Sequence, residues 1–257
     1  MIAAADHTPT PERRDDRFFL GAAIAMTVVI VAGFSVQLAM GRSSFAAPLL
    51  VHAHAVVFMG WVAIYLSQNV LATTGRLAVH RRLGWLAAVW VVPMLALGCA
   101  VTVALVRRGE VPFFFKPQQF LIFDPLTLAT FAGLTTAAIM LRRQTDWHRR
   151  LHFCAMAMLL GPGFGRLLPM PLLAPWAWEA TVAACLLFPL AGMLADLRRS
   201  GRIHPAWAWG IAATLSSTLL TEAITYSPVG DAIYHAVAAG SPGAAVPPLA
   251  FPAPPVA

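Results

Sequence analysis

The chain contains several long runs of apolar residues without charge, and these runs restrict what it can fold into. Residues 18–40 and 83–106, for example, contain no Asp, Glu, Lys or Arg. About 20 apolar residues are enough for an α-helix to cross a bilayer, and in lipid the backbone must satisfy its own hydrogen bonds. The runs are continuous, whereas the strands of a membrane β-barrel alternate apolar and polar residues. The sequence therefore predicts an all-α, polytopic transmembrane helical bundle.

Composition agrees with this fold class, and Pro and Gly divide the chain into about seven helices. Charged residues make up 11% of the chain, against about 25% in soluble domains. We place the helices at about 18–40, 48–72, 83–106, 118–141, 150–173, 177–196 and 205–226. Residues 1–17 are expected to form a cytoplasmic N-terminal segment, and 18–226 the membrane domain. Residues 227–257 are rich in Pro and Ala and contain no Lys or Arg, which predicts a mostly disordered tail.

The distribution of basic residues predicts the orientation. Thirteen of the 18 Lys and Arg residues lie in the N-terminal segment and in the loops expected on the same side, and five lie on the other side. Because the side richer in Lys and Arg is usually cytoplasmic, we expect the N-terminus inside and the C-terminus outside, in a bacterial inner membrane. The basic residues sit at the ends of apolar runs, which indicates contact with membrane lipids and no nucleic acid. A membrane protein partner is left open.

Polar side chains within the apolar runs predict an intramembrane pocket. On the helix at 48–72, His54, Tyr65 and Gln68 fall on one face, and Gly161-Pro162-Gly163 predicts a break just before Arg166. Ionisable groups in a membrane are costly and often functional. The pocket residues that we predict are His54, Tyr65, Gln68, Asp124, Arg166 and Glu222, with Arg166 paired to one of the two carboxylates. The alternatives are an interhelical hydrogen-bond network and an Arg that snorkels outward.

Histidines near the cytoplasmic side are candidate haem ligands. His80, His148 and His152 qualify, although the predicted helix ends place His80 in the headgroup layer, at a different depth from His152. A metal site is not expected, because two His two residues apart, such as His52 and His54, point to nearly opposite faces of a helix. The three Cys residues are expected to pack as small apolar side chains. A retinal protein is excluded, since the only lysine, Lys116, lies in a loop.

A short motif occurs twice. His80-Arg81-Arg82-Leu83 and His148-Arg149-Arg150-Leu151 lie 68 residues apart, each before or at the start of an apolar run. The repeat indicates either a duplicated helical hairpin or the ordinary recurrence of Arg pairs at cytoplasmic helix starts.

The residues that carry a resemblance are His54, Gln68, the two HRRL motifs, Asp124, Arg166 and His204-Pro205-Ala206. Over about 50–210 this pattern resembles a family of uncharacterised bacterial multi-pass membrane proteins with repeated HRRL motifs. It is also loosely similar to bis-histidine b-type membrane cytochromes, in helix count and in His near helix ends. These cytochromes bind haem between pairs of His on facing helices, and no two clear cross-membrane pairs are evident here.

Three function classes follow from these observations. The leading hypothesis is a membrane redox component that handles haem b or a quinone-like lipid-soluble molecule. The alternatives are a small-molecule or ion transporter that uses the Asp/Arg/Glu/His cluster, and a non-catalytic accessory membrane subunit. No residue pattern identifies a catalytic group, so the sequence leaves open whether the protein is an enzyme.

Overall fold

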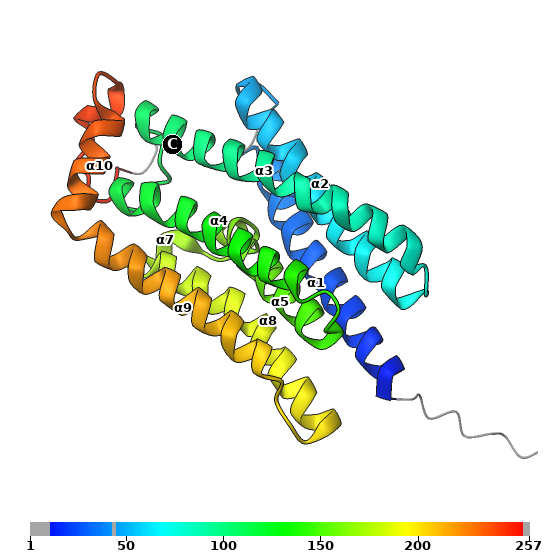
Figure 1. Ribbon diagram of the computed structural model, residues 1–257. Helices are drawn as coiled ribbons and strands as arrows, with labels where there is room; N and C mark the ends of the chain where they lie inside the picture. Colours follow the sequence, from blue (N-terminus) through cyan, green and yellow to red (C-terminus); the bar gives the residue numbers. More distant parts are fainter. Residues whose placement is uncertain (1–10, 43–44, 254–257) are drawn as a thin grey trace, which may run out of the picture.

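The computed structural model describes residues 11–42 and 45–253, and this part of the chain is almost entirely helical (Figure 1). Its ten α-helices are α1 (Pro11–Ala39), α2 (Leu49–Thr73), α3 (Leu77–Arg108), α4 (Pro117–Met140), α5 (Thr145–Met158), α6 (Gly161–Leu167), α7 (Met170–Leu173), α8 (Ala177–Ser200), α9 (Pro205–Thr225) and α10 (Pro228–Ala238). A 3-10 helix, η1, follows at Pro242–Ala245. No β-strand occurs within these described residues, which confirms the all-α class.

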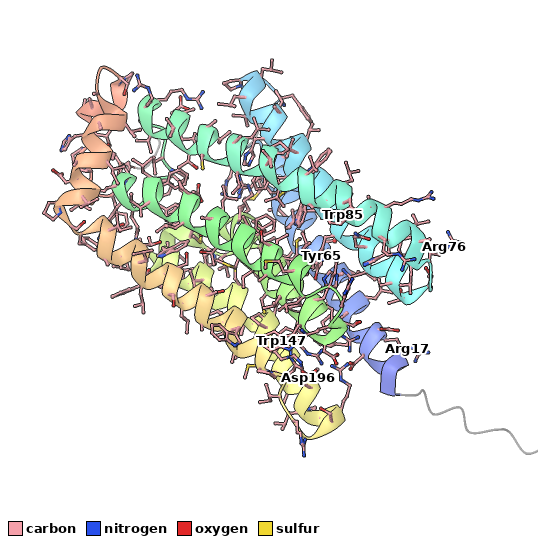
Figure 2. All side chains as sticks on the ribbon, viewed as in Figure 1. Arg17, Tyr65, Arg76, Trp85, Trp147 and Asp196 are labelled. Atoms are coloured by element: carbon pink, nitrogen blue, oxygen red, sulfur yellow. The ribbon has the colours of Figure 1, made fainter. Side chains whose placement is uncertain are left out.

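Five helices are long and apolar enough to cross a membrane: α1 from Asp15, α2, α3, α4 and α8. Together with α5, α6 and α9 they form an elongated bundle (Figure 1). The turns α2–α3, α4–α5 and α8–α9 lie toward the end of the bundle where α1 begins (Figure 1). Figure 2 labels Arg17, Arg76, Trp147 and Asp196 near that end, which we call the basic end.

Glycines at helix ends explain two of the chain reversals. Gly109 follows α3 with φ 71°, and Gly201 follows α8 with φ 68°. Residues that carry a side chain rarely adopt this left-handed backbone conformation, whereas glycine adopts it at little cost and so ends the helix. The chain turns at both places, so that α3 and α8 lie antiparallel to the helices that follow them.

The helix expected over 150–173 is divided into α5, α6 and α7. Pro162 explains the first division, because its ring clashes with the carbonyl four residues earlier, and α5 ends at Met158. The Gly/Pro sequence then allows α6 to cross α1 closely. A Cβ added to Gly33 would lie 2.6 Å from the carbonyl oxygen of Gly163, so that neither position has room for a larger residue.

The tail contradicts the expected disorder over most of its length. Ser227 accepts a hydrogen bond from the backbone N–H of Gly230 and Pro228 begins α10, a favourable start for a helix. Tyr234 is 1% exposed, and its hydroxyl lies 3.1 Å from the carbonyl oxygens of Gly243 and Val246. Composition pointed to disorder, but the apolar face of α10 finds a partner surface on α3 and α4.

Candidate functional site

The two HRRL motifs occupy equivalent positions in two hairpins. His80 is the fourth residue of α3, and His148 is the fourth residue of α5. The His80 Nδ1 lies 3.3 Å from the carbonyl oxygen of Gln68 on α2, and the His148 Nδ1 lies 2.8 Å from that of Ala138 on α4. A carbonyl oxygen only accepts, so both rings donate through Nδ1–H. In the neutral ring the Nε2 lone pair is then available to a ligand.

The structure brings the three inner histidines together. The ring centroids of His80 and His148 are 6.3 Å apart with planes at 79°, and His152 lies 4.8 Å from His148. The sequence-based expectation of mismatched depths was wrong. Its cause is the helix boundaries: α3 begins at Leu77 and α5 at Thr145, five or six residues earlier than predicted, so both rings belong to first helical turns at the basic end.

The separation of His80 and His148 fits two ligands of one metal centre. Each metal–imidazole bond is about 2 Å long and the ring radius adds to it, which gives about 6 Å between facing centroids. Within the described chain, no three His, Cys, Asp or Glu side chains converge as a bare metal ion would require. His80 and His148 would instead be the residues that hold a b-type haem, if one binds here.

Gln68 lies beside these histidines and not in the pocket predicted for it. Its backbone carbonyl holds His80, and its side-chain Nε2 would be 3.2 Å from a Cβ on Gly84, one turn after His80. The Gln68 Oε1 is buried without a hydrogen-bond partner. A buried, unpartnered acceptor is unfavourable in a protein interior and often marks a ligand position.

An ion-pair network at the basic end was missed by sequence reasoning. Arg150 and Asp196 are 5% and 3% exposed, and the Arg150 Nε and Nη2 each lie 2.9 Å from an Asp196 oxygen. The Trp207 indole N–H donates to the same carboxylate at 2.7 Å. Asp15 on α1 pairs with Arg149 and, at 2.8 Å, with Arg199. Asp196 is an acid near the Arg-rich end of an apolar run, and this exception to the Arg pattern could have indicated the network.

A second polar group, which we call the outer cluster, lies in the half of the bundle away from the basic end. It consists of His54 on α2, Thr102 on α3, Asp124 on α4 and Arg166 on α6. The Thr102 hydroxyl donates to Asp124 at 3.0 Å, and Arg166 interacts electrostatically with both Asp124 and His54. Three of the six predicted pocket residues, His54, Asp124 and Arg166, therefore interact only through longer-range electrostatics.

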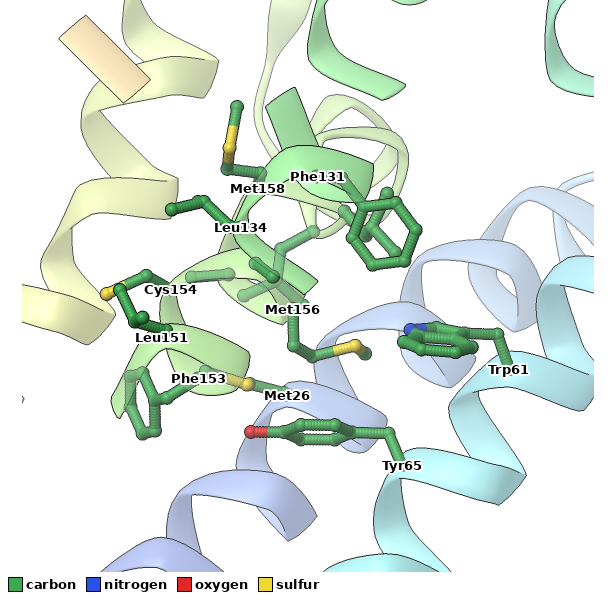
Figure 3. Close-up of a cluster of buried hydrophobic side chains, with 14 of the residues drawn as sticks. Met26, Trp61, Tyr65, Phe131, Leu134, Leu151, Phe153, Cys154, Met156 and Met158 are labelled. Carbon is green, nitrogen blue, oxygen red and sulfur yellow. The ribbon is translucent and has the colours of Figure 1, made fainter. Parts of the chain in front are cut away.

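The other predicted pocket residues lie elsewhere. Glu222 accepts a hydrogen bond of 2.7 Å from Gln119, so its partner is Gln119 and not Arg166. Arg166 forms no ion pair within 4.0 Å with any carboxylate among the described residues, so the expected charge pair is replaced by a longer-range interaction with Asp124. Tyr65 is 7% exposed and lies in the apolar core among Met26 and Met156 (Figure 3).

Comparison with known proteins adds no relative. No protein-family model, curated protein or solved structure matches the chain. The resemblance drawn from the HRRL motifs therefore stays a prediction, and the functional argument depends on the geometry of the two polar groups.

Proposed function

We propose that the protein is a seven-pass inner-membrane protein of bacteria with its N-terminus inside. In addition to the five long apolar helices, α9 and the α5–α6 segment supply two further passes. The Lys and Arg distribution supports the orientation. Reporter fusions at Arg143 and Ala245 test it: we expect a cytoplasmic signal from the first and a periplasmic signal from the second. The same compartment for both would contradict this topology.

Within that membrane domain we propose a redox component that holds one haem b between His80 and His148. The observation that carries this proposal is the close pair of rings, with centroids 6.3 Å apart and planes at 79°, each held by a backbone carbonyl. Such outer hydrogen bonds fix the orientation of a ligating imidazole and raise its basicity. Bound haem would supply one-electron transfer.

The surrounding residues fit the needs of such a pair. Gly84, one turn after His80, allows the Gln68 side chain to lie close to this helix, because an added Cβ would be 3.2 Å from the Gln68 Nε2. The half-buried rings lie at the end of an apolar core. A low local dielectric and restricted solvent access are properties that proteins use to set the potential of a haem.

The absorption spectrum of the purified protein tests this function. We expect a Soret band and, after reduction, the sharp α and β bands of low-spin, bis-histidine haem. His80→Ala and His148→Ala should each abolish this spectrum, whereas His235→Ala, on the exposed face of α10, should leave it unchanged. A colourless native protein after haem-supplemented expression, or a normal spectrum in both ligand variants, would contradict the proposal and favour transport or an accessory role.

A further inference from the structure

The outer cluster contains a guanidinium that its surroundings only partly satisfy. The Arg166 Nη1 donates to the carbonyl of Pro162 at 2.8 Å, and the guanidinium lies 4.1 Å from the ring centroid of Phe34. An Arg side chain can donate five hydrogen bonds, and an arginine within a membrane is costly unless it finds partners. The nearest negative charge is Asp124, beyond ion-pair distance. Donors on Arg166 therefore remain available to a ligand.

His54 adds an unpartnered acceptor to the same cluster. Its Nδ1 is buried without a hydrogen-bond partner. In the tautomer that carries its proton on Nε2, the Nδ1 lone pair can accept a hydroxyl. The ring is stacked on Phe58 with centroids 4.1 Å apart. Phe58 itself packs where Gly98 leaves room, 3.4 Å from the position of an added Cβ.

The charges and the aromatic rings restrict the class of ligand. Asp124 disfavours an anion beside it, and Arg166 disfavours a cation. Phe34 and Phe58 each stack on one of the polar side chains and suit a flat ring. Of the cluster, His54, Asp124 and Arg166 are only half-buried. The proposed topology puts this part of the bundle within the bilayer, so a ligand can enter from lipid. These features fit a neutral, planar, lipid-soluble molecule with oxygen atoms that accept or donate hydrogen bonds.

We propose that the outer cluster binds the head group of a lipid-soluble quinone or its quinol. Arg166 donates to one ring oxygen, and His54 Nδ1 accepts the hydroxyl of the quinol form. Asp124, which accepts a hydrogen bond from Thr102, supplies the negative charge in the same cluster. The choice of ligand class rests on the proposed redox function, but binding at the outer cluster does not require the haem pair.

Titration of the purified protein in phosphatidylcholine nanodiscs with decylubiquinone, followed by tryptophan fluorescence, tests the proposal. We expect saturable quenching, and at least tenfold weaker binding for Arg166→Gln and for His54→Phe. Glu222→Gln is the matched control, because Glu222 bonds to Gln119 outside the cluster. Circular dichroism and gel filtration verify that each variant is folded, and His54→Phe keeps a measurement available if Arg166→Gln does not assemble.

The outcomes separate this proposal from the haem proposal. Native-like binding by both Arg166→Gln and His54→Phe would show that decylubiquinone only partitions into the bilayer, and would overturn the quinone site. Absence of saturable binding by the native protein would overturn it as well. His80→Ala should retain quinone affinity while it loses the haem spectrum. A colourless native protein that still binds decylubiquinone through Arg166 would refute the haem site alone.

Discussion

The buried pair of Arg150 and Asp196 gives a quantitative prediction about stability. Asp196 accepts two hydrogen bonds from Arg150 and one from Trp207, all between 2.7 and 2.9 Å. Replacement of Asp196 by Ala leaves a buried guanidinium whose remaining anions are Asp146, at 2.8 Å, and Asp15, at 4.0 Å, and it leaves the indole N–H without this acceptor. Removal of one partner of a buried ion pair costs about 3–5 kcal/mol. We expect Asp196→Ala to lower the free energy of unfolding by that amount.

Equilibrium unfolding by sodium dodecyl sulfate in mixed micelles, followed by circular dichroism, measures this change. The control is Glu110→Ala, which removes the more exposed partner of Arg108 at the opposite end and should cost less than about 1 kcal/mol. The double variant Arg150→Met with Asp196→Ala should be more stable than Asp196→Ala alone, because no uncompensated charge is then buried. Equal stability of Asp196→Ala and Glu110→Ala would refute the reasoning.

Three further predictions concern packing, the tail and pH. Gly33→Ala should destabilise the bundle by about 1–3 kcal/mol in the same unfolding assay, because the α1–α6 crossing has no room for a Cβ, whereas Gly133→Ala, with nothing within 4 Å, should not destabilise it. Tyr234→Phe should cost about 1–3 kcal/mol and raise proteolysis after α9, because the acceptors at Gly243 and Val246 lose their buried donor. His204 caps α9, because its Nδ1 accepts a hydrogen bond from the backbone N–H of Ala206. Burial, and then the charge of Arg150, lower the pKa of His204. The stability that this cap contributes should therefore be present at pH 7 and be lost as the pH falls through the lowered pKa. Stability measured from pH 7 to pH 4 should therefore fall less in His204→Asn, and an equal fall in both proteins would contradict the assignment.

Much of the fold could be predicted because bilayer spanning imposes a simple pattern. The apolar runs locate every long helix, and Pro162 marks the division of α5 from α6. Helix starts were placed too late where Arg and His begin a helix, as at His80, because polarity was taken for a loop. The Pro- and Ala-rich composition of the tail predicted disorder, although two local features favoured a helix. Ser227 and Pro228 are a favourable helix start, and Tyr234 and Ala238 share a face one turn apart.

The candidate site was harder to predict because a helical face does not identify its neighbour. The residues from His54 to Gln68 lie on one face of α2, but they span roughly 21 Å at 1.5 Å per residue. The two ends of this face therefore have different neighbours. Glu222 was assigned to the cluster from its depth alone, but α9 packs beside α4 and α5, which brings it to Gln119. Side-chain partners depend on the arrangement of helices around the bundle, and a single sequence carries little information about that arrangement.

The inner histidines and the outer cluster lie in opposite halves of the bundle, and α3 carries a member of each. On α3, His80 and Thr102 are separated by 22 residues, roughly 33 Å of helix. Between them lies a core of Trp61, Tyr65, Phe131 and Met156, whose side chains leave little surface accessible (Figure 3). The proposed haem and quinone sites are therefore separate, and each can be lost without the other, which is why the His80 and Arg166 variants test them independently.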